Sequence, residues 1–510
     1  MQKVLILDFG GQYKELIARR VRECGVYSLI EDGDMPLEDI KKLDPIGIIF
    51  TGGPNSVYDE KSPKCDPALL KLGIPVLGIC YGCQLITYIL GGIVSPCDKS
   101  EYGRIETKVD TSSVIFKNLD ENQITLMSHT DQVTSLPSGF VGTASTSTCN
   151  YAAFANDNEK IYGVQFHPEV ENTPMGTDMI RNFLYGVCGA VGDYSMDDYL
   201  KRTIAEVREK VGDGRVLLGL SGGVDSSVAA ALLSEAVGER LVCIYIDHGL
   251  MRAGETDEIK KAFANRKLNF VPIDAEARFL SKLKGVTDPE EKRHIIGEEF
   301  IRSFEDAAHQ VGDPEFLAQG TIYPDIVESG KKNKSAVIKS HHNVGGLPER
   351  MNFKGIVEPL SHLFKDEVRA LGRMLGLPDS LVNRQPFPGP GLAVRVIGEV
   401  TKEKCDMLRA ADLIFRTEMT ACTDPEARAD QYFAVLTDTR SVGVKGDFRT
   451  YGYTLALRAV RTSDFMTCRV CRLPYDLIER VASRISNEVD GIGRVVYDIT
   501  GKPPATIEWE

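Results

Sequence analysis

Short, uninterrupted apolar runs, each followed by a glycine turn and a helical pattern, occur in two separate parts of this chain. The first series contains KVLILDFG (3–10), IGIIFTGG (46–53) and IPVLGIC (74–80). A second series starts at RVLLGLSGG (215–223) and continues with RLVCIYIDHG (240–249). Apolar runs without alternation are typical of parallel strands buried on both faces, which need helices as crossover connections. The sequence therefore predicts an α/β fold with two doubly wound sheets.

The chain has 510 residues, which is too long for one hydrophobic core and predicts about three domains. The alternation of strands and helices stops near residue 190 and resumes at 214. The run RQPFPGPGLAVR (384–395) is dense in proline and glycine, which is typical of a linker. Mixed strand and helix patterns follow it and predict a small α+β domain. The predicted domains are 1–190, 191–384 and 385–510.

Charge and hydropathy argue against two classes of partner. The net charge is −13 and no run of Lys and Arg stands out, so we expect no nucleic-acid partner. No stretch of about 18 apolar residues is present, so we expect no membrane partner. The segment MQKVLILDFGGQY is typical of a strand and a helix start rather than of a signal peptide. We therefore expect a cytoplasmic protein.

Twelve cysteines are too few for a disulfide scaffold in a chain of this length. Two pairs have CxxC spacing, Cys80 with Cys83 and Cys468 with Cys471. Neither pair has a second pair of ligands nearby, as a structural zinc site requires. Cys468 and Cys471 are therefore expected to be reduced thiols, whereas a redox role for Cys83 beside Cys80 stays open.

One cysteine lies at a turn between a buried strand and a helix, in GICYGC (78–83). A nucleophile between two glycines at such a turn is exposed above the sheet, and the helix N-terminus favours a thiolate. QFHPE (165–169) places a histidine and a glutamate two residues apart at the end of another strand. Nucleophile, base and orienting carboxylate together are the requirements of acyl transfer. Cys80, His167 and Glu169 are therefore the candidate catalytic residues.

The loop SGGVDSS (221–227) follows a buried strand and opens an alanine-rich helix, as a phosphate-binding loop does. It has no lysine after its last glycine, which the Walker motif requires for transfer of a terminal phosphoryl group. The absence of this lysine indicates that ATP is cleaved between the α- and β-phosphates. N–H groups, hydroxyls and Mg²⁺ would then hold the pyrophosphate. Asp225 is the candidate Mg²⁺ ligand. The candidate ATP-binding residues are Ser221, Gly222, Gly223, Val224, Asp225, Ser226, Ser227 and, at the end of the next strand, Asp247.

The motifs GICYGCQL, TGGPNSV and GVQFHPE resemble those of the class I glutamine amidotransferases, which release ammonia from glutamine. The resemblance implies that Cys80 forms the glutamyl thioester, that His167 transfers the proton and that Glu169 orients His167. It also implies an oxyanion hole built from the N–H groups of Gly53 and Tyr81. The other glutamine contacts that it implies are Gln84, Ser128 and His129.

SGGVDSS resembles the pyrophosphatase loop of ATP-dependent adenylating enzymes. Motifs along nearly the whole chain, among them LAQGTIYPDIVES and YDITGKPPATIEWE, resemble the glutamine-hydrolysing GMP synthetase family. This resemblance implies three domains in order: a class I amidotransferase, an adenine-nucleotide alpha-hydrolase-like ATP pyrophosphatase and a dimerisation domain. It implies a ligase of purine biosynthesis, in which the C2 oxygen of xanthosine monophosphate (XMP) attacks the α-phosphate of Mg·ATP. Pyrophosphate leaves, and ammonia then displaces AMP to give GMP.

The same resemblance assigns the remaining sites. The polar stretch 320–346 matches the family's lid, in which Asp325 and Glu328 would act at the Mg·ATP end, while Lys339 and His341 would close over the intermediate. The third domain implies a homodimer. The implied XMP contacts are Arg302, Gln431, Lys502, Ile507 and Glu508, which requires an ordered C-terminal tail.

Three other functions stay open. The same ATP chemistry would serve an adenylating amidotransferase that acts on another acceptor. A tRNA-thiolating enzyme combines such a loop with a reactive CxxC, although an acidic chain without a basic patch argues against it. A regulatory protein that only senses nucleotides would not need the set Cys80, His167 and Glu169.

Overall fold

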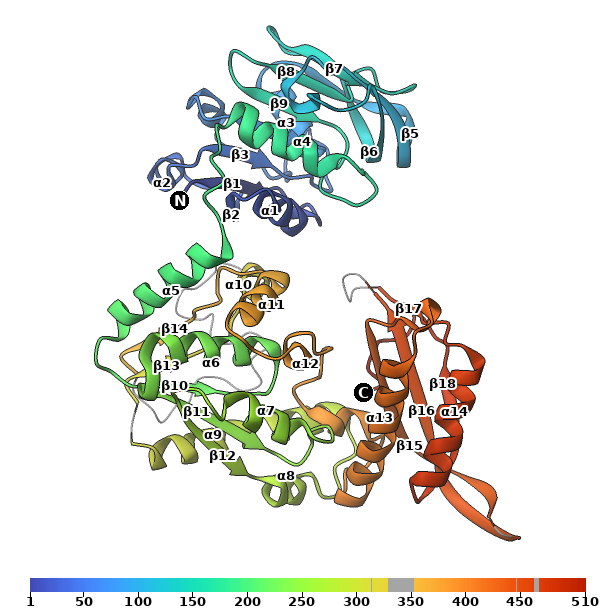
Figure 1. Ribbon diagram of the computed structural model, residues 1–510. Helices are drawn as coiled ribbons and strands as arrows, with labels where there is room; N and C mark the ends of the chain where they lie inside the picture. The colour runs from blue at the N-terminus through green and yellow to red at the C-terminus, as the bar shows by residue number, and fades with distance from the viewer. Residues whose placement is uncertain (313, 329–352, 446, 463–466) are drawn as a thin grey trace. The chain divides into compact units, whose positions relative to one another are not determined.

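The computed structural model describes residues 1–312, 314–328, 353–445, 447–462 and 467–510 (Figure 1). The chain forms two compact units, Met1–Tyr199 and Leu200–Glu510. The division between them falls within a helix, so the sequence-based boundaries at 190/191 and 384/385 stay predictions. Within the described residues, no helix combines the length and the apolar character needed to cross a bilayer.

A nine-stranded sheet with the order β2-β1-β3-β4-β9-β8-β7-β5-β6 forms the first unit. Its parallel strands are β1 (Lys3–Asp8), β2 (Tyr27–Asp32), β3 (Gly47–Phe50), β4 (Val76–Ile79) and β9 (Ile161–Val164). Its antiparallel strands are β5 (Ile93–Val109), β6 (Asn122–Ser135), β7 (Val141–Ser145) and β8 (Ala153–Asn156). The helices are α1 (Lys14–Glu23), α2 (Leu37–Leu43), α3 (Tyr81–Ile89) and α4 (Gly176–Asn182). The uninterrupted apolar runs form the buried parallel strands, which confirms the first predicted α/β sheet.

A five-stranded parallel sheet with the order β12-β11-β10-β13-β14 begins the second unit. Its strands are β10 (Val216–Gly219), β11 (Leu241–Asp247), β12 (Asn269–Asp274), β13 (Phe316–Ala318) and β14 (Gly355–Val357). The helices are α5 (Met196–Val211), α6 (Val224–Val237), α7 (Glu255–Phe263), α8 (Glu276–Leu283), α9 (Pro289–Gln310), α10 (Tyr323–Glu328), α11 (Lys365–Met374) and α12 (Asp379–Val382). The chain starts at the central β10 and winds first to one side and then to the other. The sheet is therefore doubly wound, as predicted, with its switch point beside β10, where such folds bind ligands.

A mixed sheet and two long helices complete the second unit, which confirms the predicted α+β character of this part. β15 (Gln431–Lys445) and β16 (Phe448–Arg461) form a long antiparallel hairpin. β17 (Arg469–Val470) pairs with β16 in an antiparallel arrangement. β18 (Ile492–Asp498) also pairs with β16, in a parallel arrangement. The helices α13 (Lys402–Ala421) and α14 (Tyr475–Glu488) pack on this sheet (Figure 1).

The segment 384–395, predicted to be a linker, instead joins the core with its last six residues. Its last five residues form a buried turn, and Leu392 N donates to Leu250 O at 2.8 Å. Gly391 has φ 63°, and a Cβ at this position would lie 2.3 Å from Leu250 O, so only glycine allows this approach. One hydrophobic core continues from β10 through this segment into β16. Proline and glycine serve close packing here rather than flexibility.

Candidate functional sites

Cys80 lies at a strained turn between β4 and α3. Its backbone has φ 51° and ψ −107°, a conformation that costs a residue with a side chain about 1–3 kcal/mol. A Cβ at Gly78 would lie 2.7 Å from the backbone of Gly82, and one at Gly82 would lie 2.6 Å from Phe50 O. The two glycines therefore allow the strand, the turn and the helix to approach closely. The turn presents the thiol at the carboxyl end of the sheet, as the motif predicted.

His167 and Glu169 follow β9, the parallel neighbour of β4. His167 Nδ1 lies 2.8 Å from Glu169 Oε1, and Glu169 is completely buried. Burial alone would lower the pKa of His167, but the Glu169 carboxylate and a hydrogen bond to Cys80 raise it well above its ordinary value. The structure thus joins nucleophile, base and carboxylate in the order that acyl transfer requires.

A cavity of about 420 Å³ opens above Cys80. Gln84 Nε2 donates to Asp131 O at 2.7 Å and to Gln165 Oε1 at 3.2 Å, so the amide is held at the wall of this cavity. Sequence reasoning did not propose the other ten wall residues, among them Tyr13, Tyr102 and Asp131, which no catalytic motif marks. All eight residues proposed for glutamine chemistry line the cavity: Gly53, Cys80, Tyr81, Gln84, Ser128, His129, His167 and Glu169.

Two of the proposed wall residues have buried polar partners. Cys80 Sγ lies 3.8 Å from Ser128 O, within hydrogen-bonding range for sulfur. His129 Nε2 lies 3.1 Å from Glu101 Oε2, and its Nδ1 lies 3.0 Å from Asp131 O. The histidine ring is therefore held by neighbours outside the catalytic set, which fixes the wall next to Ser128.

Cys83 does not have the environment of a redox partner for Cys80. Its side chain is completely buried in the hydrophobic core beneath α3. Burial, together with the nearby Cys80, raises the pKa of the Cys83 thiol well above its ordinary value. Disulfide exchange proceeds through a thiolate, so this environment disfavours it.

The loop 221–227 joins β10 to the N-terminus of α6. Gly222 has φ 80°, a left-handed conformation that the glycine permits. Gly223 N donates to Ser221 Oγ at 3.3 Å, and the Ser221 and Ser226 hydroxyls lie 2.9 Å apart. Ser227 Oγ is buried without a hydrogen-bond partner among the described residues. Hydroxyl and N–H groups at a helix N-terminus form a site suited to an anion.

A lysine does reach this loop, from 140 residues further along the chain. Lys365, the first residue of α11, places Nζ 2.7 Å from both carboxylate oxygens of Asp225. The motif itself has no lysine, as the sequence shows, but the fold brings one to its carboxylate. No local pattern could have revealed it, because α11 follows β14 rather than the loop.

The other nucleotide candidates lie near the same edge of the sheet. Asp247 ends β11 and accepts hydrogen bonds from Thr256 Oγ1 at 2.7 Å and from Gly249 N at 3.1 Å. A Cβ at Gly320 would lie 3.1 Å from Ser226 N, so the polar stretch 320–346 begins against the phosphate loop. Asp325 Oδ2 accepts from Ile322 N at 3.0 Å.

Glu328 ends α10, and its side chain lies outside the described residues, as do Lys339 and His341 entirely.

Gln431 and Glu508, two candidate XMP contacts, meet at 3.1 Å. Glu508 is also bound through two contacts by Arg395, at 3.0 and 2.7 Å. The chain end is ordered because the fully buried Arg458 donates to the carbonyls of Thr506 and Ile507, at 3.0 and 3.2 Å. Sequence reasoning missed both arginines, although an arginine inside the apolar run GLAVRVIG was a signal.

The two other XMP candidates differ in position. Lys502 exchanges two backbone hydrogen bonds with Cys468, both of 3.0 Å, in the strand-like pairing that leads to the C-terminal tail. Arg302 lies half-exposed on α9 beside Glu298, and no contact given for the described residues joins it to the other four candidates. Four of the five candidates thus lie on or beside the tail and its sheet.

Three family models match successive parts of the chain. Residues 5–187 match glutamine amidotransferase class-I, residues 196–291 match NAD synthase and residues 418–509 match GMP synthase C terminal domain. Three curated relatives, each named GMP synthase (glutamine-hydrolyzing), are similar over the whole chain. The relative from Treponema denticola is 59% identical over 509 residues, which cover 100% of this chain and 97% of the relative.

The relatives from Acetivibrio thermocellus and Finegoldia magna are 58% and 56% identical, each over 509 residues. These matches cover 99% and 100% of this chain, and 99% of each relative. The chain belongs to the glutamine-hydrolysing GMP synthase family. Its amidotransferase match contains the Cys80 cavity, its NAD synthase match contains the phosphate loop, and its GMP synthase match contains Gln431 and Glu508.

Proposed function

We propose that this chain converts XMP to GMP, with glutamine as nitrogen donor and with ATP cleaved to AMP and pyrophosphate. The full-length similarity to GMP synthases, at 59% identity, carries the proposal. Two separate sites support it, because amination of a carbonyl oxygen needs both a source of ammonia and an activating nucleotide. The Cys80 cavity suits the first task and the loop 221–227 suits the second.

In the first site, the Cys80 thiolate attacks the carboxamide carbon of glutamine. His167 donates its proton to the departing ammonia and then accepts one from the water that hydrolyses the thioester. Glu169 keeps the imidazole oriented and stabilises its charged form across the 2.8 Å contact. The N–H groups of Gly53 and Tyr81, both at the cavity wall, stabilise the tetrahedral oxyanion.

In the second site, the C2 oxygen of XMP displaces pyrophosphate from the α-phosphate of ATP. XMP is bound by Arg302 and, on the tail side, by Gln431, Lys502, Ile507 and Glu508. The hydroxyls of 221–227 and the Lys365 ammonium hold the departing pyrophosphate, and Asp247 lies at the adenosine side. Residues of the stretch 320–346 act at the Mg·ATP end and over the intermediate. Ammonia then displaces AMP from C2.

Asp225 is the residue that fits Mg²⁺. Mg²⁺ on nucleotides is typically held by one or two carboxylates together with phosphate oxygens, and Asp225 supplies one carboxylate, held 2.7 Å from a lysine ammonium. Within the described ranges, no group of three or more His, Cys, Asp or Glu side chains is placed to hold a metal ion. When bound with ATP, Mg²⁺ would neutralise charge that develops on the pyrophosphate.

The products of ATP distinguish this reaction from ordinary kinase-like activation. We expect the chain, supplied with XMP, glutamine and Mg·ATP, to form GMP, AMP and pyrophosphate in equal amounts, because the α–β bond breaks once for each amination. Chromatographic separation of the nucleotides and an enzymatic pyrophosphate assay measure this directly. Formation of ADP and orthophosphate would contradict the proposed reaction.

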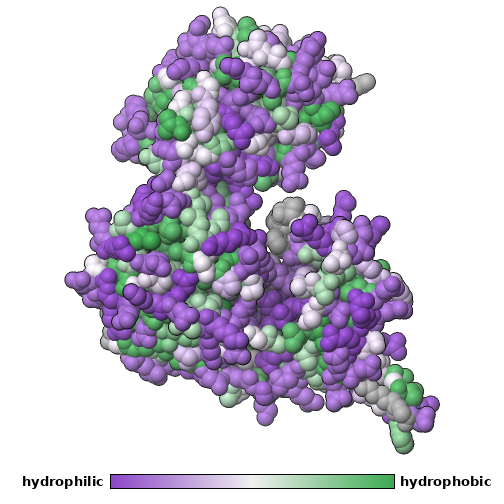
Figure 2. All heavy atoms as spheres, in the orientation of Figure 1, coloured by the Kyte–Doolittle hydropathy of each residue, from purple (hydrophilic) through white to green (hydrophobic). Residues whose placement is uncertain are grey.

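We also propose a homodimer formed through the β15–β16 hairpin. Hydrophobic side chains gather at the far end of this hairpin (Figure 2), where Phe448 is 76% exposed and Val444 is 73% exposed. Val442 and Tyr451 face each other across the two strands, and both are exposed. Exposed apolar patches of this kind are typical of interaction surfaces.

Phe448→Asp is therefore expected to convert the dimer to a monomer, because a carboxylate would be desolvated in the apolar contact. Light scattering at several protein concentrations measures the mass. The matched control is Tyr475→Asp, which changes an aromatic residue that is 73% exposed on α14. A wild-type chain that is monomeric at all concentrations, or a dimer that survives Phe448→Asp, would refute this interface.

A further inference from the structure

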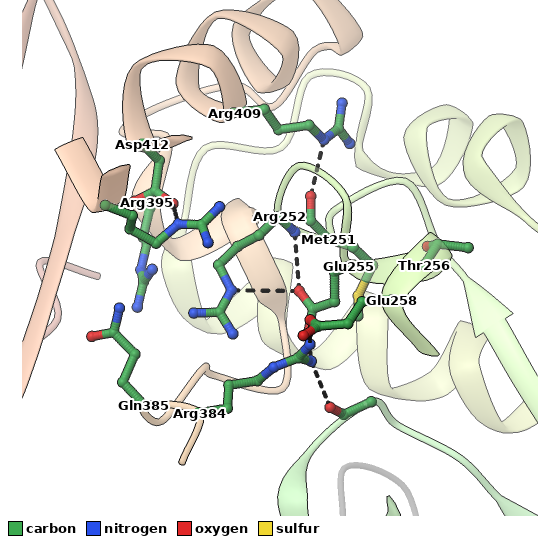
Figure 3. A network of polar contacts seen from close by, with 12 residues as sticks. Met251, Arg252, Glu255, Thr256, Glu258, Arg384, Gln385, Arg395, Arg409 and Asp412 are labelled. Carbon is green, nitrogen blue, oxygen red and sulfur yellow. Dashed lines mark hydrogen bonds and ion pairs between the residues drawn. The ribbon is translucent and has the colours of Figure 1, made fainter. Parts of the chain in front are cut away.

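The side chain of Arg384 binds a backbone carbonyl of the phosphate loop 221–227. Its Nη1 donates to Gly222 O at 2.7 Å and to Glu255 Oε1 at 2.6 Å, and its Nη2 donates to Glu258 (Figure 3). The side chain is only 8% exposed. Three of the five N–H donors of its guanidinium are thus engaged by protein groups.

The contact to Gly222 O determines where the next N–H points. Gly222 O and Gly223 N–H belong to one planar peptide and point in opposite directions. Because Arg384 binds the oxygen from one side, the N–H is directed into the loop, where it now meets Ser221 Oγ at 3.3 Å. Gly222, with φ 80°, has a left-handed conformation that glycine permits.

The two carboxylates keep Arg384 in place. Glu255 and Glu258 lie in the first turn of α7, and Glu255 Oε2 also accepts from Arg252 N at 3.2 Å (Figure 3). Buried ion pairs of this kind contribute little net stability, because desolvation of the charges offsets their attraction. The ion pair of Arg384 with Glu255 therefore has a different role from stabilising the fold: it fixes one orientation of the loop.

Gln385, the residue that follows Arg384, contacts the start of β15, beside the candidate XMP contacts. Gln385 accepts from Tyr432 N at 2.8 Å and donates to Tyr432 O at 2.9 Å. Tyr432 is next to Gln431, which contacts Glu508 at 3.1 Å. Two consecutive side chains therefore connect the phosphate loop with the start of β15, where the candidate XMP contacts lie.

We propose that Arg384 is a positioning residue that orients the Gly222–Gly223 peptide so that its N–H faces the departing pyrophosphate. The inference rests on the proposed function. Gly223 N–H exchanges Ser221 Oγ for a pyrophosphate oxygen when nucleotide binds. The contact strengthens as negative charge accumulates on the leaving group, so it acts mainly in the transition state.

The test compares Arg384→Gln and Arg384→Lys with the wild-type chain, with ammonium as nitrogen donor. For Arg384→Gln we expect kcat to fall about 30- to 100-fold, the inhibition constant of inorganic pyrophosphate to rise about tenfold, and KM for XMP to stay within about twofold. Arg384→Lys keeps one donor for Gly222 O and should recover at least about a third of kcat. Glutamine hydrolysis at Cys80 should be unchanged in both.

Arg215→Gln is the matched control. Arg215 also donates to the carbonyl of a left-handed glycine, Gly312, at 2.9 Å, but it lies before β10, at the end opposite the loop. This control should keep wild-type kcat and pyrophosphate inhibition. If Arg384→Gln behaves like Arg215→Gln, or if Arg384→Lys shows no recovery and both variants lose thermal stability and affinity for all substrates, Arg384 is only a structural ion-pair residue. A wild-type chain that releases no pyrophosphate would instead refute the proposed function.

Discussion

Cys80→Ala is expected to abolish GMP formation from glutamine while GMP formation from ammonium continues. The substitution removes the nucleophile that forms the thioester, so glutamine hydrolysis should fall by at least about 10⁴-fold. The ATP and XMP residues lie in the other compact unit, so the rate with saturating ammonium should stay within about twofold of wild type. Parallel assays of glutamate and GMP formation measure the two reactions.

Cys188→Ala is a suitable control for this experiment. Cys188 belongs to the same unit but lies outside the residues that line the Cys80 cavity, and alanine is of similar size. We expect this variant to keep both nitrogen sources. Loss of the ammonium-driven reaction in Cys80→Ala would show that the two sites do not work separately, which contradicts the arrangement proposed here.

Lys365→Ala should have the second large effect, and it should reduce GMP formation from both nitrogen donors. Removal of the ammonium that lies 2.7 Å from Asp225 takes away a side-chain cation next to the loop, where we propose that the pyrophosphate charge accumulates. We expect a loss of about 10²–10³-fold in kcat with glutamine or with ammonium, as for other donors aimed at developing negative charge. Glutamate formation at Cys80 should persist. Steady-state rates with each nitrogen donor provide the measurement.

Unfolding would not explain that loss. The Lys365–Asp225 pair is partly exposed, and pairs of this kind contribute about 0–1 kcal/mol to stability. Lys354→Ala, which removes a more exposed lysine paired with Glu315 at 3.2 Å, is the control and should keep normal activity. Unchanged kcat in Lys365→Ala would show that the loop holds pyrophosphate without this cation.

The local motifs predicted the first site because their chemistry is contained in short segments. A glycine on each side of Cys80 allows the turn, and His167 and Glu169 are two residues apart, so both pairs of neighbours are visible in the sequence. Parallel pairing of β4 with β9 then brings the segments together. The uninterrupted apolar runs likewise predicted both doubly wound sheets, because such runs are typical of parallel strands buried on both faces.

Residues that act across long separations could not be predicted in this way. Lys365 is an ordinary lysine at the start of an amphipathic helix, and its role depends on α11 beginning beside the phosphate loop. The segment 384–395 has the composition of a linker, but a glycine that permits flexibility also permits close packing, as Gly391 shows against Leu250. Composition cannot distinguish these two uses, because the difference lies in what packs against the backbone.

The amino-acid sequence by itself determined the fold class and singled out the candidate catalytic set of Cys80, His167 and Glu169 and the candidate phosphate loop, since each depends on periodicity or on a few adjacent residues. Only the tertiary structure decided that Lys365 completes the loop, that Arg384 holds Gly222 O, and that Arg395 and Arg458 order the C-terminal tail. The physical reason is that a long charged side chain places its charged group several ångströms from its own backbone. Which group it meets there depends on the packing of distant elements, and local sequence patterns do not contain that information.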